Sequence, residues 1–264
     1  MSTLGSLAGR VALVTGAGSE TGIGYSTARV LGELGARVVI TSTTERIYER
    51  VDALGKLGIV AAGYVADLTD PFAVEQLRDV SLSAFGRVDI LINNAGMTSL
   101  HQGSDVIGVL ESLTVQAWHT GLERNLSTAF MVTRAFVGPM KERGWGRVVM
   151  IASTTGAVNS MPGHAIYATA KAAMIGLTRS LALEVASRGV TVNAVGPGWI
   201  ATGSASAEEI AFGNASPLGR SGSPEEVAAV AGALCLPGMS YVTGQLIVVD
   251  GGNSIAEARA VGDR

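Results

Sequence analysis

The chain has 264 residues, of which 47% are hydrophobic and 16% charged, and its formal net charge is −3. This length suits one sizeable globular domain, so we expect residues 1–264 to form one domain with a core over about 7–254 and a polar tail over 255–264. The slightly acidic balance, without a cluster of lysines and arginines, argues against nucleic acid or an anionic membrane as the main partner.

The cysteine and histidine content gives no sign of a disulfide or a metal site. Cys235 is the one cysteine and has no partner for an internal disulfide. The spacing of His101, His119 and His164 matches no metal-ligand motif, so no metal is expected. The N-terminus lacks a basic segment followed by an apolar one, and no uncharged apolar run approaches roughly 18 residues, so we expect a cytoplasmic protein.

Short β-branched runs alternate along the chain with longer segments of helical period. Strands are predicted over residues 11–15, 37–41, 60–66, 88–93, 147–153, 190–196 and 245–252. Helices are predicted near residues 22–34, 45–57, 71–84, 115–143, 165–187 and 224–236, and loops over 98–114 and 203–222. Most strand segments are apolar on both faces, which suits a parallel sheet covered by helices on both sides. This alternation predicts an α/β fold, a Rossmann-like doubly wound parallel sheet of about seven strands.

The first predicted strand leads into the sequence TGAGSETGIG, residues 15–24, directly before a predicted helix. Glycines at such a turn let the backbone approach a pyrophosphate, and the N-terminus of the helix directs unpaired N–H groups at it. A chain with 35 glycines also produces such patterns by chance. The position after the first strand favours a dinucleotide site over a simple tight turn.

Polar residues follow the third and fourth predicted strands. Asp67 either accepts a hydrogen bond from an adenine amine or caps the helix that starts near Pro71. The sequence NNAG, residues 93–96, either forms a turn, because asparagine tolerates left-handed backbone, or contacts a cofactor. The residues alone leave both alternatives open.

The sequence YATAK puts Tyr167 and Lys171 four residues apart, and therefore on one face of a helix. A nearby ammonium group is expected to lower the tyrosine pKa by about three units, which corresponds to roughly 4 kcal/mol and makes the phenol useful for proton transfer. An isolated pair of this kind is more often a surface tyrosine beside a solvated lysine. Ser153, at the end of the fifth strand, and Asn125, in the long helix, complete a polar cluster that favours catalysis.

These segments occur in the order found in single-domain short-chain dehydrogenases/reductases, and the chain resembles 3-oxoacyl-[acyl-carrier-protein] reductases in particular. The likeness spans about residues 7–254 and rests on TGAGSETGIG, Asp67-Leu68, NNAG, ERNLST around Asn125, IASTTG around Ser153, YATAK, VNAVGPGWIAT and VVDGG. Each motif alone is weak, whereas their joint occurrence is specific. The resemblance implies an NAD(P)-dependent oxidoreductase that transfers a hydride between nicotinamide C4 and a ketone or secondary alcohol.

The resemblance also implies a role for each matching residue. Tyr167 exchanges a proton with the substrate oxygen, and Ser153 hydrogen-bonds that oxygen. Lys171 binds the nicotinamide ribose and lowers the tyrosine pKa, while Asn125 kinks its helix and holds a water that links Lys171 to solvent. The implied cofactor-binding residues are Gly16, Gly22, Ile23 and Gly24 for the pyrophosphate, Asp67 and Leu68 for the adenine, Asn94, Ala95 and Gly96 for the ribose, and Pro197, Gly198, Ile200 and Thr202 for the nicotinamide side, together with Tyr167 and Lys171.

Two spacings differ from the family pattern. Gly16 and Gly22 enclose five residues where the family usually has three, so the glycine-rich turn must bulge. The interval from Ser153 to Tyr167 is one residue longer than in many relatives. Ser153 is still preferred to the two threonines that follow it, which would lie past the strand end.

The end of the second predicted strand bears on the choice of cofactor. NAD enzymes typically place an acidic residue there, which binds the ribose hydroxyls and repels a 2′-phosphate. This chain has Ser42 and Thr43 instead, with Arg46 one turn into the helix, whereas Glu20 in the glycine-rich loop opposes a phosphate. NADP(H) is therefore favoured over NAD(H).

The expected substrate pocket offers apolar surface, which suits a neutral, fairly hydrophobic ketone and a carbonyl reductase. Its candidate residues are Thr98 to His101, Ser153, Met161, His164, Trp199, Ile210 and Phe212. A 3-oxoacyl-[acyl-carrier-protein] reductase of fatty-acid synthesis is the alternative. A non-catalytic dinucleotide-binding sensor is the alternative from another class, but it has no need of the four catalytic candidates together. Alanine-rich helices around residues 116–137 and 165–186, and the assembly of relatives, predict a homotetramer.

Overall fold

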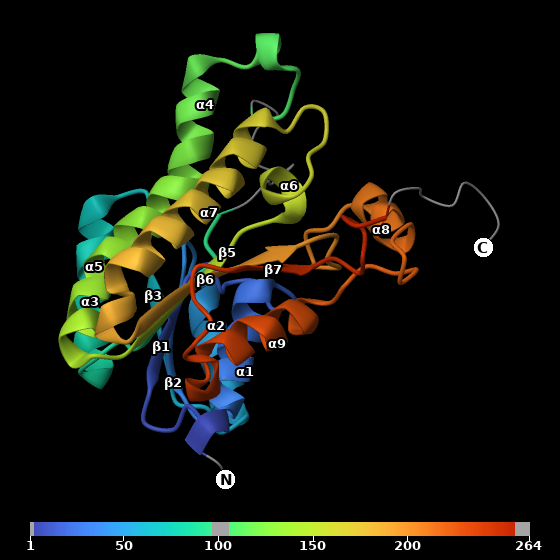
Figure 1. Ribbon diagram of the computed structural model, residues 1–264. Helices are drawn as coiled ribbons and strands as arrows, with labels where there is room; N and C mark the ends of the chain where they lie inside the picture. The colour runs from blue at the N-terminus through green and yellow to red at the C-terminus, as the bar shows by residue number, and fades with distance from the viewer. Residues whose placement is uncertain (1–2, 97–105, 257–264) are drawn as a thin grey trace.

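The computed structural model describes residues 3–96 and 106–256, and within these ranges seven strands form one parallel sheet. The strand order is β3-β2-β1-β4-β5-β6-β7, which confirms the predicted doubly wound sheet (Figure 1). The strands are β1 (Val11–Val14), β2 (Arg37–Ser42), β3 (Ala61–Val65), β4 (Ile90–Asn93), β5 (Gly146–Ile151), β6 (Val190–Pro197) and β7 (Leu246–Val249). The order reverses between β1 and β4, and a crevice for ligands forms outside the carboxyl ends of such strands.

Helices cover both faces of the sheet. One face packs against α3 (Pro71–Phe85), α5 (Thr128–Arg143) and α7 (Ala165–Val185), and the other against α1 (Ile23–Glu33), α2 (Arg46–Lys56) and α9 (Pro224–Cys235). Three shorter helices, α4 (Val115–Leu122), α6 (Thr154–Ala157) and α8 (Ala207–Asn214), lie toward the carboxyl ends of the strands in Figure 1.

The central strands are apolar without alternation because both of their faces are covered. In β1, Val11 and Leu13 belong to the core beneath α3, α5 and α7, whereas Ala12 and Val14 belong to the core beneath α1, α2 and α9. Successive side chains of a strand point to opposite faces, so every position must be apolar. The edge strands β3 and β7 are only half-buried, since each has a neighbour on one side.

One predicted helix and one predicted loop differ from the structure in the elements they contain. The helix predicted over residues 115–143 is divided into α4 and α5 by a π-helical segment, Glu123–Ser127. The loop predicted over 203–222 contains α8, whose first turn is held by a capping box. In that box, Ser206 Oγ accepts from Glu209 N and the Glu209 carboxylate accepts from Ser206 N.

Over the described ranges, no helix is long and apolar enough to cross a membrane. A group of three or more histidine, cysteine or acidic residues able to hold a metal ion is likewise absent from those ranges. Cys235 is fully buried at the end of α9, where it fills core space.

Candidate active site

The sequence-predicted site residues gather at the carboxyl ends of the strands. The loop after β1, Ser42 at the end of β2, Asp67 after β3 and Asn94 after β4 all lie at this edge, as do Ser153 after β5 and Pro197 at the end of β6. All strands are parallel, so the segments that follow them meet at one edge of the sheet. The structure therefore brings together residues from six separate stretches of the chain (Figure 1).

The glycine-rich loop is fastened to the end of β4 by the NNAG segment. Asn94 Nδ2 donates to the Thr15 and Gly16 carbonyl oxygens, both at 2.9 Å. Thr15 Oγ1 accepts from the backbone N–H groups of Asn94 at 3.0 Å and of Ala95 at 2.9 Å. A Cβ atom on Gly24 would lie 2.5 Å from Asn94 Nδ2, so that position requires glycine. Asn94 and Ala95 thus position the loop rather than merely turning the chain.

The start of α1 fits an anionic group. Its N-cap residue is Gly22, and across residues 3–96 and 106–256 no side chain caps the first amides, nor does the first turn carry an acid. In contrast, α3 and α4 are capped by the side chains of Asp70 and Thr114. Uncapped amides at a helix N-terminus bind phosphate groups well. These residues therefore suit the pyrophosphate of a dinucleotide.

The glycine-rich loop, which is two residues longer than the family pattern, contains a turn before Gly22. Gly22 N donates to the Ser19 carbonyl oxygen at 3.2 Å, which closes this turn. Gly18 lies against the end of β2, since a Cβ on it would be 2.8 Å from Ser42 Cβ. A Cβ on Gly203 would be 2.3 Å from Thr21 Oγ1, so the segment after β6 also contacts the loop.

The segments after β3 and β6 complete this edge of the sheet. The Asp67 carboxylate accepts from Thr69 N at 3.0 Å and from Thr69 Oγ1 at 2.7 Å, whereas the helix α3 is capped by Asp70. The alternative that Asp67 caps α3 is therefore wrong, because the cap position directly precedes Pro71. Leu68 is buried in the core, while Asp67 is exposed.

After β6, the chain turns over the site through a series of backbone contacts. Gly198 N donates to the Val249 carbonyl oxygen at 2.9 Å, and Ile200 forms a parallel bridge with Gly222. Thr202 N donates to the Ile200 carbonyl oxygen at 2.8 Å. Pro197, Gly198, Ile200 and Thr202 therefore lie in one segment that faces the glycine-rich loop.

Ser153 lies two residues beyond the end of β5, so the strand predicted over 147–153 is shorter than expected. Ser153 Oγ accepts from Thr155 N at 3.1 Å and caps α6, and the Ser153 side chain lies close enough to the Tyr167 phenol to lower its pKa. Gly156, in the turn that follows, has φ of +87°, and a Cβ on it would lie 2.0 Å from the Ala168 carbonyl oxygen. The Ser153 turn is thus pressed directly against the backbone of α7 beside Tyr167.

Tyr167 and Lys171 lie one turn apart on α7, as predicted, and Lys171 is 3% exposed. Lys171 Nζ donates to the Ile151 carbonyl oxygen at 2.9 Å and lies 5.6 Å from the centroid of the Tyr167 ring. Burial lowers the pKa of Lys171 to about 8.

The predicted lowering of the tyrosine pKa by Lys171 is wrong in this structure. Burial raises the pKa of Tyr167; the hydrogen bond with Ser153 opposes this shift, and the negative charge of Glu209 adds to it. The physical reason is that partial burial of Tyr167 disfavours the charged phenolate, while the Lys171 ammonium is bonded to a backbone carbonyl.

Asn125 lies in the π-helical segment between α4 and α5, which is where the family resemblance implies a kink. Its side chain is buried, and Nδ2 donates to the Gly121 carbonyl oxygen at 3.1 Å. A Cβ on Gly96 would lie 2.9 Å from Asn125 Oδ1, so the NNAG segment ends against this side chain. Asn125 therefore links the kinked helix to the loop after β4, which favours a positioning role.

The expected substrate pocket is apolar on the side of α8. The Trp199 and Phe212 rings lie 5.0 Å apart, while His164 occupies the position directly before α7. Ile210 lies on α8, and Met161 precedes α7; both are half-buried. The candidates Thr98 to His101 lie outside the described residues.

Sequence reasoning missed three residues at or near this site: Gly156, Glu209 and Arg50. Glu209 had a signal, because Ser206 and Glu209 match the S-x-x-E pattern of a capping box. Gly156 and Arg50 had none, because their importance depends on contacts between distant segments.

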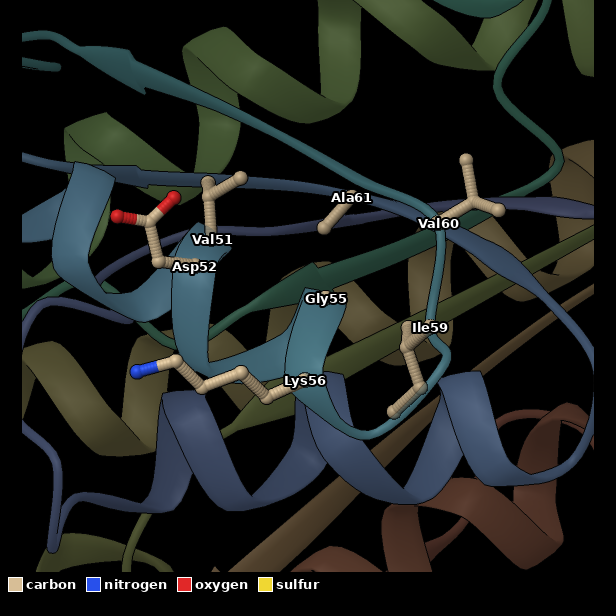
Figure 2. Close-up of a pocket in the computed structure, with 7 residues that line it drawn as sticks. All are labelled: Val51, Asp52, Gly55, Lys56, Ile59, Val60 and Ala61. Atoms are coloured by element: carbon tan, nitrogen blue, oxygen red, sulfur yellow. The ribbon is translucent and has the colours of Figure 1, made fainter.

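The hollow shown in Figure 2 is separate from this edge. It has a volume of about 610 Å³ and lies between the end of α2 and the start of β3, lined by Val51, Asp52, Gly55, Lys56, Ile59, Val60 and Ala61. The start of a parallel strand lies at the opposite edge of the sheet from its carboxyl end, so this hollow contributes nothing to the candidate site.

Comparison with known proteins gives the same picture as the geometry. A protein-family model described as enoyl-(acyl carrier protein) reductase matches residues 16–254. The 3-oxoacyl-[acyl-carrier-protein] reductase FabG of Vibrio cholerae is 38% identical over 251 residues, which cover 93% of this chain and 98% of that protein. The chain belongs to the short-chain dehydrogenase/reductase family. It is accordingly an NAD(P)-dependent oxidoreductase that acts on CH–OH or C=O groups.

Two solved structures resemble this short-chain dehydrogenase/reductase over nearly their whole length. A variant of actinorhodin polyketide ketoreductase with NADPH is 36% identical, with a TM-score of 0.85 and coverage of 93% of this chain and 97% of that one. A 7α-hydroxysteroid dehydrogenase with NADH and 7-oxo glycochenodeoxycholic acid is 29% identical, with a TM-score of 0.87 and coverage of 96% and 97%. One neighbour holds NADPH and the other NADH, so the fold itself accommodates either cofactor.

Proposed function

We propose that this protein is a carbonyl reductase that acts on a neutral, fairly hydrophobic ketone or the corresponding secondary alcohol. The observation that carries the proposal is that the Ser153 hydroxyl lies close enough to the Tyr167 phenol to act on its pKa, one helical turn from the buried Lys171. Two adjacent hydroxyl groups can both donate to one carbonyl oxygen, which a cofactor-binding protein without catalysis does not need.

Each residue of this cluster has a distinct task. A nicotinamide cofactor, when bound, supplies or accepts the hydride. Tyr167 donates a proton to the substrate oxygen during reduction, and Ser153 orients that oxygen through a hydrogen bond. Lys171 offers its remaining N–H groups to ribose hydroxyls, and Asn125 holds a water on the path from Lys171 to solvent.

The substrate class follows from the groups around Tyr167. The Trp199 and Phe212 rings, which contact each other at a tilt of 33°, offer apolar surface. The negative charge of Glu209 acts on Tyr167 and opposes an anionic substrate. Reduction of 3-oxoacyl groups on acyl-carrier protein is the second candidate, supported by the 38% identity to FabG.

NADP(H) is the favoured cofactor because the end of β2 has no acidic side chain. Ser42 Oγ donates to the Thr44 carbonyl oxygen at 2.8 Å, and Thr43 beside it is exposed. Small hydroxyl side chains leave room for a 2′-phosphate and can donate to it.

A homotetramer is proposed on the basis of exposed apolar side chains on the helices expected to pack together. Val115 on α4, Phe130 on α5 and Leu183 on α7 are 73%, 49% and 84% exposed. Burial of such side chains between subunits is favourable. Scattering that gave a mass of 26.9 kDa would remove this claim. The cytoplasmic location stays a prediction.

The first experiment follows absorbance at 340 nm with NADPH and NADH side by side. The panel contains aryl ketones, cyclic ketones, β-keto esters, a 3-oxoacyl thioester and an enoyl thioester, and the Tyr167→Phe variant is the control. We expect one cofactor to be oxidised with a ketone, and Tyr167→Phe to lose turnover by on the order of 100-fold or more while cofactor affinity stays within about threefold. Unchanged turnover in Tyr167→Phe, or oxidation with the enoyl thioester alone, would refute the proposal.

A further inference from the structure

Arg50 on α2 lies between the glycine-rich loop and the start of α1. Its Nη1 is 3.3 Å from Glu20 Oε2, and its Nη2 is 2.9 Å from the carboxylate of Glu49. The guanidinium carbon lies 5.7 Å from the centroid of the Tyr25 ring. The Arg50 side chain is only 12% exposed, whereas the Glu20 side chain is 76% exposed. A nearly buried cation is thus paired with a solvated carboxylate of the loop.

The guanidinium of Arg50 retains donor capacity. Its Nε is buried and finds no hydrogen-bond partner in the part of the chain that the structure describes. A buried N–H without a partner is unfavourable, and arginine cannot relieve this by losing its proton. An ion pair with an exposed partner such as Glu20 contributes about 0–1 kcal/mol and exchanges readily. Arg50 is therefore held in place, but its loop-side partner is easily replaced.

The position of Arg50 relates it to the adenosine end of the proposed cofactor site. Gly18, two residues before Glu20, packs against Ser42 at the end of β2. The end of β2 is where this class of fold distinguishes a ribose 2′-hydroxyl from a 2′-phosphate. The longer glycine-rich loop thus places the Glu20 carboxylate beside Arg50. This pair lies near the position where the fold distinguishes a 2′-hydroxyl from a 2′-phosphate. Arg46 also lies beside the end of β2, because its Nε donates to Thr44 Oγ1 at 3.3 Å and Ser42 Oγ donates to the Thr44 carbonyl oxygen at 2.8 Å, but unlike Arg50 it is exposed.

We propose that Arg50 is a specificity-determining residue for the 2′-phosphate of NADP(H), and that Glu20 occupies Arg50 until a 2′-phosphate displaces it. This inference rests on the proposed cofactor preference. A phosphate carries more charge than a carboxylate and accepts paired N–H groups from arginine. A 2′-hydroxyl carries no charge and leaves the Glu20–Arg50 pair closed.

The ion pair with Arg50 also changes the expected effect of the Glu20 charge on phosphate binding. From the sequence, Glu20 opposes a phosphate. In the structure the charge of Glu20 is offset in part by Arg50, which it shares with Glu49, so Glu20 opposes a phosphate less than the sequence indicates. Displacement of Glu20 into solvent costs little, because the carboxylate is already mostly hydrated.

The test measures cofactor binding rather than turnover. Dissociation constants for NADPH and NADH are obtained by nicotinamide fluorescence, and those for 2′,5′-ADP and 5′-AMP by calorimetry, with wild type, Arg50→Ala, Arg50→Lys and Glu20→Gln. The matched control is Arg78→Ala, because Arg78 is an exposed arginine on α3 that pairs with its neighbour Asp79.

We expect Arg50→Ala to weaken NADPH and 2′,5′-ADP by on the order of tenfold or more, as for loss of a charged hydrogen bond, and to leave NADH and 5′-AMP within about threefold. Arg50→Lys gives an intermediate loss, because lysine keeps the charge without the paired donors. Glu20→Gln strengthens NADPH binding and leaves NADH binding unchanged, while Arg78→Ala changes neither.

Several results would overturn the inference. Equal losses for NADPH and NADH in Arg50→Ala would make Arg50 a structural support of the loop, and the proposed function would stand. Weaker NADPH binding in Glu20→Gln would refute the proposal that Glu20 and the 2′-phosphate compete for Arg50. Wild type that bound neither cofactor would refute the proposed function as well. If Arg50→Ala fails to fold, Arg50→Lys and Glu20→Gln still decide the question.

Discussion

The contact between Gly156 and α7 gives a sharp prediction for the variant Gly156→Ala. A Cβ at this position would lie 2.0 Å from the Ala168 carbonyl oxygen, whereas real Cβ contacts stay above 3.0 Å. The Ser153 turn must therefore move away from α7 by about 1 Å, and a misplacement of this size costs on the order of 100-fold in rate. The φ of +87° adds roughly 1–2 kcal/mol of backbone strain for alanine.

The assay compares kcat, cofactor affinity and thermal unfolding of Gly156→Ala with those of wild type. We expect kcat to fall by on the order of 100-fold with cofactor affinity nearly unchanged, because the turn holds Ser153 rather than the glycine-rich loop. Gly55→Ala on α2 is the control, since nothing lies within 4 Å of a Cβ there. That variant keeps full activity and gains up to about 1 kcal/mol of stability. Wild-type kcat and stability in Gly156→Ala would refute the argument that this contact sets the distance between Ser153 and Tyr167.

Three further predictions concern stability and cofactor choice. The Lys171 pKa of about 8 in the folded state lies below its ordinary value of 10.5, so between these values only the unfolded state holds the proton and stability rises with pH. In urea unfolding, the free energy of unfolding of wild type should therefore rise by about 2–3 kcal/mol relative to that of Lys171→Met between pH 7 and pH 10. A difference that did not change with pH would contradict the argument that burial lowers the Lys171 pKa. Asp89 is fully buried and accepts from Val11 N and from Arg87, so Asp89→Asn should lower the free energy of unfolding by about 3 kcal/mol without changing NADPH affinity; a loss below about 0.5 kcal/mol would be inconsistent with this pairing. Ser42→Asp should shift the ratio of NADPH to NADH dissociation constants toward NADH by about tenfold or more, and no shift would mean that the ribose pocket lies elsewhere.

The fold was predictable because each central strand is apolar on both faces and is followed by a segment of helical period. The positions at which the strands end were less predictable. The strand predicted over 245–252 stops at Val249, because Gly251 and Gly252 adopt positive φ and turn the chain. The break at Glu123–Ser127 could not be read from the hydrophobic period, because a π-helical turn shifts the helical phase by only about one residue. The resemblance carried by Asn125 alone implied a kink there.

It was also predictable from the parallel sheet that the candidate site residues would lie together. Parallel strands deliver every strand-end motif to one edge, so Ser153 and Tyr167 meet although 13 residues separate them. The pairing of Glu20 with Arg50 could not be predicted, because it depends on the path of a loop whose length departs from the family pattern. Spacing also carries no information on burial, which is why the sign of the Tyr167 shift was missed.

The direction of that shift bears on the direction of the reaction. A tyrosine whose pKa is raised by burial stays protonated near neutral pH, and a protonated phenol donates a proton to a carbonyl oxygen but cannot accept one from an alcohol. Lys171 does not reverse this preference, because its own pKa is lowered to about 8 and its ammonium loses charge before a phenolate forms. The carboxylate of Glu209 acts in the same sense as burial. A tyrosine at its ordinary pKa of about 10 is already protonated near neutral pH. Burial therefore strengthens the proton-donor role that Tyr167 has in ketone reduction, and it does not create that role.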